Sequence, residues 1–272
     1  MRTNYNLPEG MRYSLLLERR EFYEKEFDIS AVEKWLSEHR NPLSTVFAAV
    51  IGRHTGIFLS RFKDYTKAPV VIDDYENLKD AKKQIATFLP EGVYYDRNVY
   101  EDLGACGRCK KPYGECWGCK GFLGQELAFD IDPENIPCPK CGTLAEKMKR
   151  GQGLGFCEHE LEIAKFQALG LSEELGKRFE RTEVVYSGRG YHVHVFDKKA
   201  QTMVRAKRRE LALGMKAKGY YIDSWVTEGE SRLIRLPFSL HAMVSRIVLP
   251  VKKERLPAFD PVKDYGCRPK FL

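Results

Sequence analysis

The chain has 272 residues, of which 43% are hydrophobic and 31% charged, and 45 Lys and Arg against 38 Asp and Glu give a net charge of +7. This mixture is typical of a folded globular protein and excludes a low-complexity chain, and the length allows one large domain or two small ones. No apolar N-terminal signal or bilayer-spanning apolar run is visible. We therefore expect a cytoplasmic protein with no membrane partner, and a basic bias compatible with a polyanionic one.

The N-terminal part of the chain predicts helices around a set of strands. Residues 11–39 have helical periodicity and many charges, which indicates one or two amphipathic helices. Residues 46–60 are expected to be rich in strand, residues 80–88 to form a short helix, and residues 92–100 to be extended. Helices and strands thus alternate without a Gly/Ser linker, which favours an α/β (α+β) fold with mixed sheets and flanking helices.

A short acidic strand is the most informative element. Leu127, Phe129 and Ile131 alternate with Ala128, Asp130 and Asp132. Because side chains on a strand alternate between its faces, both carboxylates project from one face, about 7 Å apart. Such a pair suits divalent cations in a two-metal phosphoryl-transfer site. On spacing alone, two solvated aspartates on the polar face of an edge strand explain the pattern equally well.

Cysteine pairs flank the acidic strand. Six of the eight cysteines form three Cys-x-x-Cys pairs, at Cys106/Cys109, Cys116/Cys119 and Cys138/Cys141. Without a secretory signal, metal binding explains them better than a disulfide framework, although intracellular disulfides of hyperthermophiles remain the alternative. The first two pairs supply four ligands for one tetrahedral Zn²⁺, and Cys138, Cys141, Cys157 and His159 form a second candidate set. Each set would be structural, because four protein ligands leave no open position.

A second polar element follows a long helical pattern over residues 158–181. Ser187-Gly188-Arg189-Gly190-Tyr191-His192 joins two β-type runs, and its glycines let backbone N–H groups approach a ligand closely. The alternative is a plain β-hairpin. A basic helix is expected over residues 200–218, with a solvated face or a nucleic-acid backbone as its two interpretations.

The third polar element runs from Asp223 to His241 and includes Arg232 and Arg235. Arginines and histidine form the forked cationic donor set that triphosphate recognition needs. Structural ion pairs with Glu228 and Glu230 are the alternative interpretation of the arginines.

Taken together and in this order, the three elements resemble the archaeo-eukaryotic primase superfamily, and in particular the catalytic small subunit of archaeal DNA primase. The resemblance rests on Phe129-Asp130-Ile131-Asp132, on the Ser187 to His194 turn and strand, and on Arg232-Leu-Ile-Arg-Leu-Pro-Phe-Ser-Leu-His241 after Asp223. It covers residues 90–251. The chain departs from the family pattern in its short Ser187–His192 turn and in Met243-Val-Ser after His241.

The resemblance implies a function and a site. The function is template-directed nucleotidyl transfer from nucleoside triphosphates, as a DNA primase or primase-polymerase. The implied ligands of two catalytic Mg²⁺ or Mn²⁺ ions are Asp130, Asp132 and Asp223. The residues implied to surround the nucleotide are Ser187, Gly188, Arg189, Gly190, His192, Arg232, Arg235 and His241.

The resemblance also implies partners and an organisation. The partners are a single-stranded DNA template and primer, together with a large primase subunit or a further C-terminal domain, and a prokaryotic protein would be associated with the nucleoid. We expect one catalytic domain over residues 1–272, with zinc-binding insertions at 104–122 and 138–160. A two-metal nuclease, or a non-catalytic zinc-knuckle module that binds nucleic acid, are the alternative functions.

Overall fold

The computed structural model describes residues 4–103, 119 and 121–272. Its α-helices are α1 (Leu16–Glu21), α2 (Ile29–Ser37), α3 (Leu78–Phe88), α5 (Leu144–Lys149), α6 (Glu158–Gly176), α7 (Lys198–Gln201), α8 (Arg205–Ala217) and α9 (Ser224–Thr227). Its strands are β1 (Phe47–Val50), β2 (Val70–Ile72), β3 (Gly92–Asp96), β4 (Asn98–Tyr100), β5 (Phe122–Gln125), β6 (Leu127–Ile131), β7 (Thr182–Tyr186), β8 (Tyr191–Val195), β9 (Leu233–Arg235), β10 (Leu240–His241), β11 (Arg246–Ile247) and β12 (Leu249–Val251).

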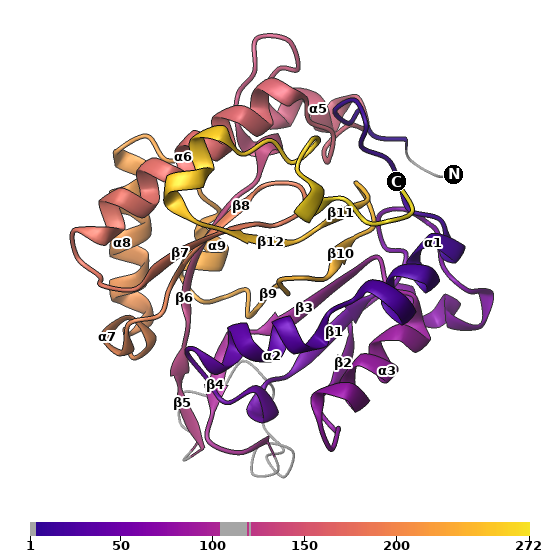
Figure 1. Cartoon of the computed structure of the whole chain (residues 1–272). Coiled ribbons are helices and arrows are strands. Elements are labelled where there is room, and N and C mark those ends of the chain that lie inside the picture. The colour runs from indigo at the N-terminus through magenta and orange to yellow at the C-terminus, as the bar shows by residue number, and fades with distance from the viewer. Residues whose placement is uncertain (1–3, 104–118, 120) are drawn as a thin grey trace.

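Two four-stranded antiparallel sheets form the frame of the molecule. The first has the strand order β2-β1-β3-β9 and the second the order β12-β7-β8-β6, while β4–β5 and β10–β11 are separate pairs. Figure 1 shows α1, α2 and α3 beside the first sheet, and α6 and α8 beside the second. The mixed α/β fold expected from the sequence is therefore confirmed.

The first sheet is covered by helices whose starts are marked in the sequence. The carboxylate of Asp28 accepts hydrogen bonds from the backbone N–H groups of the first turn of α2, and Asn77 caps α3 in the same way. Val32 and Leu36 of α2 are fully buried against this sheet. The capped, amphipathic helices thus fix the sheet that supplies one wall of the cavity described below.

The second sheet has two faces of different character. Phe129 and Ile131 of β6 and Val193 of β8 belong to the core beneath α6 and α8. The alternate residues Asp130 and His192 face the other way, toward the first sheet, since side chains alternate along a strand. The polar face of β6 and β8 therefore lies between the two sheets.

A buried polar network joins the two sheets behind that face. Glu126, just before β6, accepts hydrogen bonds from Arg40 Nη2 at 2.5 Å and from the Tyr95 hydroxyl of β3 at 3.0 Å, and its Oε1 lies 2.6 Å from Nδ1 of His194. All four side chains are buried. Buried charges are tolerated when they are paired in this way, and the network links the sheets to each other.

Most elements expected from the sequence are present, with changed boundaries. Residues 11–39 form α1, a π-helical turn at Phe22–Glu26, and α2. Residues 46–60 contain the single four-residue strand β1 and then turns. The basic helix expected from residue 200 is split into α7 and α8. Among the described residues, no helix combines the length and the apolarity that crossing a membrane requires.

Candidate active site and metal centre

The acidic strand pairs with the histidine strand. In the β6–β8 ladder, Asp130 lies opposite His192, and Oδ1 of Asp130 is 3.5 Å from Nε2 of His192. Burial, and next the neighbouring His194, hold the pKa of His192 well below its ordinary value, so its imidazole is neutral. His192 is therefore a neutral neighbour of Asp130 and offers a hydrogen bond rather than a charge.

Asp223 joins the two strand aspartates through its backbone. Its N–H donates to the carbonyl of Asp130 at 2.9 Å, which ties the start of α9 to β6. One carboxylate oxygen of Asp223 accepts from the N–H of Trp225 and caps α9. The structure thus brings Asp223, which is far away in the sequence, to the end of β6 that carries Asp130 and Asp132.

The neighbouring acids raise the affinity of Asp130 for protons. The pKa of Asp130 lies well above its ordinary value because of burial, and then because of the charges of Asp132, Asp223 and Glu134. Clustered carboxylates of this kind repel unless a cation or protons lie between them. The donor set consists of carboxylate oxygens, which Mg²⁺ and Mn²⁺ prefer, so the residues fit the divalent ions implied by the sequence.

Arg189 is held by acids rather than left free. Its guanidinium pairs with the carboxylate of Glu134, lies 3.7 Å from Asp132, and donates to the carbonyl of Leu154 at 3.3 Å. Burial alone would lower the pKa of Arg189, but the carboxylates of Glu134 and Asp132 raise it. Burial and the charge of Asp132 raise the pKa of Glu134 to about 7, although Arg189 opposes them. Arg189 is thus fixed at the edge of the acid cluster.

The turn that carries Arg189 is closed on itself. The backbone N–H of Gly190 donates to the Ser187 hydroxyl at 3.0 Å. A Cβ at Gly190 would lie 2.4 Å from the carbonyl of Ile131, and one at Gly188, where φ is +93°, would lie 2.4 Å from Cβ of His241. The two glycines therefore allow the turn to pack tightly between the acidic strand and His241.

The first sheet supplies the opposite wall. Arg235 of β9 donates to the hydroxyl of Tyr94 on β3 at 2.5 Å, and its guanidinium carbon lies 4.5 Å from the centre of that ring. His241 is buried, and burial, followed by the charges of Arg235 and Arg189, holds its pKa well below the ordinary value. A cavity of about 210 Å³ separates these residues from the acids. The predicted residues that line it are Asp130, Asp132, Ser187, Arg189, His192, Arg235 and His241.

Arg232 does not reach this cavity. Its guanidinium lies 3.1 Å from Oδ2 of Asp96, a buried carboxylate whose pKa is raised by burial. Arg232 precedes β9 and lies at Asp96, the last residue of β3, whereas Arg235 is paired with Tyr94 further along the ladder. The structure thus brings Arg235 but not Arg232 to the acids, and the ion pair of Arg232 is with Asp96 rather than with Glu228 or Glu230.

Several residues that line the cavity have a buried side-chain polar atom without a hydrogen-bond partner. These atoms are Oδ1 of Asp130, Oε2 of Glu134, Nδ1 of His192, Nη1 of Arg235 and Nδ1 of His241. Buried polar groups in folded proteins are nearly always hydrogen-bonded, to protein, water or a ligand. The carboxylate oxygens could be satisfied by a metal ion, and the cationic donor on the opposite wall by an anion bound to that metal.

Three residues of the cavity were missed in the sequence: His54, Tyr94 and Glu134. Glu134 continues the two-residue spacing of Asp130 and Asp132, and this spacing could have found it. No local signal marks His54 or Tyr94, because only the pairing of the first sheet brings them to the site.

The second cysteine set gathers beside α5 and α6. Ligand atoms of Cys138, Cys141, Cys157 and Glu160 all lie within 4.8 Å of one another, and this is the only such group of Cys, His, Asp or Glu in the described part of the chain. The carboxylates of the three aspartates are therefore spaced more widely. Backbone hydrogen bonds between Cys138 and Gly142 close the turn between the first two thiols. Three converging thiols fit Zn²⁺, so these residues form a candidate metal centre.

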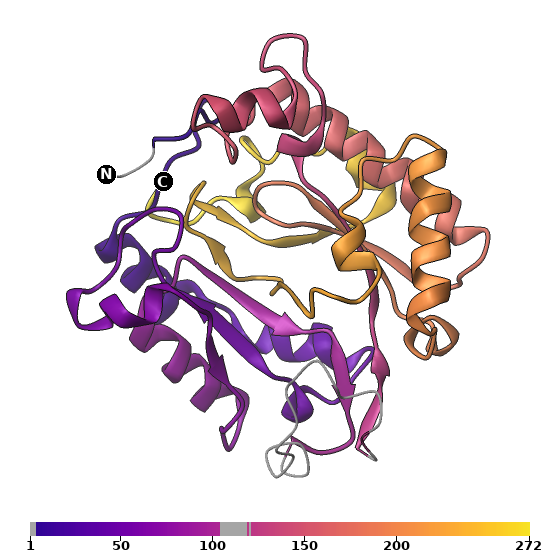
Figure 2. The same ribbon diagram turned by 180° about the vertical axis from the view of Figure 1, so that it is seen from behind.

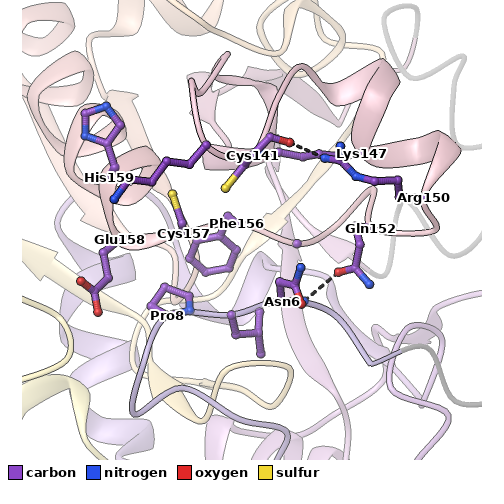
Figure 3. A pocket seen from close by; sticks show the side chains of 13 residues that line it. Asn6, Pro8, Cys141, Lys147, Arg150, Gln152, Phe156, Cys157, Glu158 and His159 are labelled. Atoms are coloured by element: carbon purple, nitrogen blue, oxygen red, sulfur yellow. Dashed lines mark hydrogen bonds between the residues drawn. The ribbon is translucent and has the colours of Figure 1, made fainter.

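The fourth position differs from the one expected. Figure 3 shows the thiols of Cys141 and Cys157 turned toward each other and the imidazole of His159 turned away from them, at the edge of a cavity of about 560 Å³. Glu160 lies within reach instead, although its carboxylate also pairs with the buried Lys147. The structure therefore does not bring His159 into the group. Of the first set, Cys106, Cys109 and Cys116 lie outside the described residues, and Cys119 is half-buried.

Comparison with known proteins gives the family. The chain is 52% identical over 258 residues to an uncharacterized DNA primase small subunit-like protein of Archaeoglobus fulgidus, and the alignment covers 94% of this chain and 91% of the relative. The chain belongs to the DNA primase small subunit-like family. The resemblance seen in the three sequence motifs is thereby confirmed.

More distant similarities extend beyond this primase-like relative. The DNA primase small subunit PriS of Pyrococcus abyssi is 28% identical over 269 residues, which cover 92% of this chain and 65% of PriS. The polymerase domain of Mycobacterium tuberculosis ligase D, solved in complex with DNA, matches 92% of this chain and 91% of that domain with a TM-score of 0.48 and 12% identity. No protein-family profile matches the chain.

Proposed function

We propose that this member of the primase-like family is a template-directed nucleotidyltransferase, which makes or extends DNA or RNA strands from nucleoside triphosphates. The observation that carries the proposal is the cavity between the sheets, which the carboxylates of Asp130 and Asp132 line together with the cationic Arg235. Asp130 and Arg235 each have a buried polar atom without a hydrogen-bond partner. We propose nucleotidyl transfer as the chemistry of this cavity because the chain belongs to the DNA primase small subunit-like family.

In this proposal the acids hold the reacting groups. Asp130, Asp132 and Asp223 bind two divalent ions at the end of β6, and their clustered charge favours cations there. When bound, Mg²⁺ or Mn²⁺ activates the 3′-hydroxyl and neutralises the leaving pyrophosphate. The neutral His192 beside Asp130 donates a hydrogen bond to a phosphate oxygen.

The opposite wall holds the triphosphate. Arg235, which lines the cavity, is oriented by Tyr94 and has no hydrogen-bond partner at its buried Nη1, and His241 lies beside the turn at Gly188. Arg189, held by Glu134, adds positive charge at the rim. Because little covalent chemistry is asked of the protein, catalysis is mostly positioning and electrostatic stabilisation.

The rest of the proposed function concerns a structural zinc site and the partners of the protein. Zn²⁺ at Cys138, Cys141 and Cys157 stiffens the segment next to the site. The proposed partners are a single-stranded DNA template, a primer and nucleoside triphosphates, with a large primase subunit that assists initiation.

The test is nucleotide incorporation on single-stranded DNA, with and without a primer, using Mg²⁺ or Mn²⁺ and either ribo- or deoxynucleotides. We expect Asp130→Asn/Asp132→Asn to lower incorporation at least 100-fold, because the metal-binding charge is lost while the side-chain shapes are kept. Asp64→Asn, at an exposed aspartate far from the cavity in sequence, is the matched control.

The outcomes separate the alternatives. Synthesis without a primer would make the protein a primase, and extension alone a polymerase. Strand cleavage that depends on Asp130 would instead indicate a nuclease. DNA binding with no incorporation under any condition would contradict the proposed activity for this chain.

A further inference from the structure

An exposed tryptophan stands next to the acid cluster. Of the two tryptophans in the described residues, Trp35 is buried, whereas Trp225 is 62% exposed. Trp225 follows Asp223 by two residues, and its N–H donates to the Asp223 carboxylate at 2.9 Å. The Asp223 N–H is in turn bonded to the carbonyl of Asp130. The backbone of Trp225 is therefore tied to the proposed catalytic centre, and its indole is exposed although burial in a core would stabilise it more.

A basic helix is packed against the short helix α9, which carries Trp225. Figure 2, the view from behind, shows the short α9 next to α8, and the two helices are in contact. Arg205, at the start of α8, pairs with Glu230, whose backbone N–H donates to the carbonyl of Trp225 at 3.1 Å. Arg209 lies one helical turn further along the same side of α8 as Arg205. Aromatic and cationic side chains thus follow one another along this surface.

The charge on this surface is unbalanced. The exposed side of α8 carries Arg205, Lys207, Arg209 and Lys216 against the single acid Glu210, which pairs with Lys207. Within the described residues, no carboxylate lies within ion-pair distance of Arg209 or Lys216. Exposed, unpaired cations on a helix that is packed against the one carrying an exposed indole suit a flexible polyanion with aromatic bases.

We propose that Trp225 and the Arg205–Arg209 side of α8 form a docking surface for single-stranded DNA, with one base stacked on the indole and the adjoining phosphates along α8. Single-strand sites combine stacking aromatics with a basic track, whereas protein–protein interfaces are depleted in lysine. A strand docked here passes directly beside Asp223. The choice of DNA rests on the proposed function, but the binding itself needs neither metal nor nucleotide.

The test measures the affinity of the full chain for a fluorescein-labelled 16-mer of deoxythymidine, by anisotropy without metal or nucleotide. Trp225→Ala is expected to weaken binding about tenfold, because stacking of one base is lost, while Trp225→Phe keeps a ring and stays within about threefold. Tyr265→Ala removes an aromatic ring that is 88% exposed elsewhere and should leave the affinity unchanged. Arg209→Gln should weaken binding and lower the salt dependence by about one phosphate contact.

The surface and the proposed enzyme can fail separately. Equal loss in Trp225→Ala and Tyr265→Ala, or no loss in either, would overturn the docking surface whatever the incorporation assay shows. A tenfold loss specific to Trp225, found in a protein that incorporates no nucleotide, would support the surface and contradict the enzyme. Tighter binding of the matching RNA 16-mer through Trp225 would overturn the choice of DNA.

Discussion

Glu134 and Arg189 form the closest ion pair at the site, and both side chains are nearly excluded from solvent. The second contact of Arg189, to Asp132, is longer, at 3.7 Å. The arrangement makes Glu134 the residue that fixes the guanidinium, while the carboxylate of Asp132 stays available to a cation. In the proposed function, Glu134 would therefore act on the nucleotide through Arg189.

We expect Glu134→Gln to raise the KM for nucleotide about tenfold and to change kcat less, because a charge-assisted hydrogen bond of about 1.5–3 kcal/mol is replaced by a neutral one. The measurement is steady-state incorporation at varied nucleotide concentration. In an Arg189→Gln background the same substitution should add little, since the two residues act as a pair. Additive effects, or an equal effect of Glu33→Gln at an exposed glutamate, would show that Glu134 does not act through Arg189.

At single residues, the sequence predicts which chemical group is present better than it predicts where the side chain points. The two-residue spacing of Asp130 and Asp132 was enough to place both carboxylates on one face, and the structure agrees. Arg232 and Arg235 looked equivalent in the sequence because both are forked cations. Only the pairing of β9 with β3, which places Arg232 beside the buried Asp96 and Arg235 beside Tyr94, separates them.

Among the elements, the turn between Cys138 and Gly142 and the start of α6 form one unit. Cys157 is the N-cap residue of α6, and its N–H donates to the carboxylate of Glu160 at 2.9 Å. The same glutamate pairs with Lys147 of α5. A metal bound to the three thiols would therefore couple α5, α6 and the segment that follows the acidic strand.

We expect the purified protein to contain Zn²⁺, and Cys141→Ser to lose about one Zn²⁺ per chain and to lower the melting temperature. The reason is that three thiols converge within ligand distance and a hydroxyl is a poor zinc ligand. Elemental analysis by mass spectrometry measures this. Cys267→Ser, at a buried thiol outside the group, is the matched control.

The fourth ligand can be identified in the same way. His159→Ala should keep the metal and Glu160→Gln should weaken its retention, because the carboxylate and not the imidazole lies in the group. Retention in Glu160→Gln with loss in His159→Ala would reverse this assignment. The sequence favoured His159 because spacing shows which residues are near one another, but not which face of a helix start each one occupies.

At the scale of the whole molecule, stability depends on histidines that are neutral when folded. His39 stacks on Phe196 with ring centres 3.9 Å apart and meets the edge of Trp35. Burial lowers the pKa of His39 to about 3. Because this value lies below that of the unfolded chain, near 6.5, the unfolded state binds the proton more tightly. The contribution is complete above pH 6.5 and is lost as the pH falls toward 3.

We expect His39→Phe to be less sensitive to acid than the natural protein. Between pH 7.5 and 5.5, the free energy of unfolding of the natural protein should fall by about 1.4 kcal/mol more than that of His39→Phe. Urea unfolding at the two pH values measures this difference, and it also cancels the contributions of other buried histidines. Equal losses in the two proteins would mean that the pKa of His39 is the same in the folded and unfolded states.

Local sequence patterns do not predict how the two sheets pack against each other. Residues 92–100 and 127–131 were expected to be extended, and they are, but nothing in either segment indicates that they lie in different sheets. Tyr94 and His54 reach the cavity only through that packing. The family resemblance, which rests on three motifs, supplied the arrangement that residue patterns alone did not.

The cavity has one wall on each sheet, and this has a consequence for anyone who would build a smaller version of the protein. The carboxylates come with β6, and Arg235 comes with β9, so neither sheet holds a usable half of the site. Glu126, with Arg40, Tyr95 and His194 around it, sets the spacing between the walls from behind. A graft of the acidic strand into another scaffold would carry the metal ligands but leave the nucleotide's phosphates without a partner.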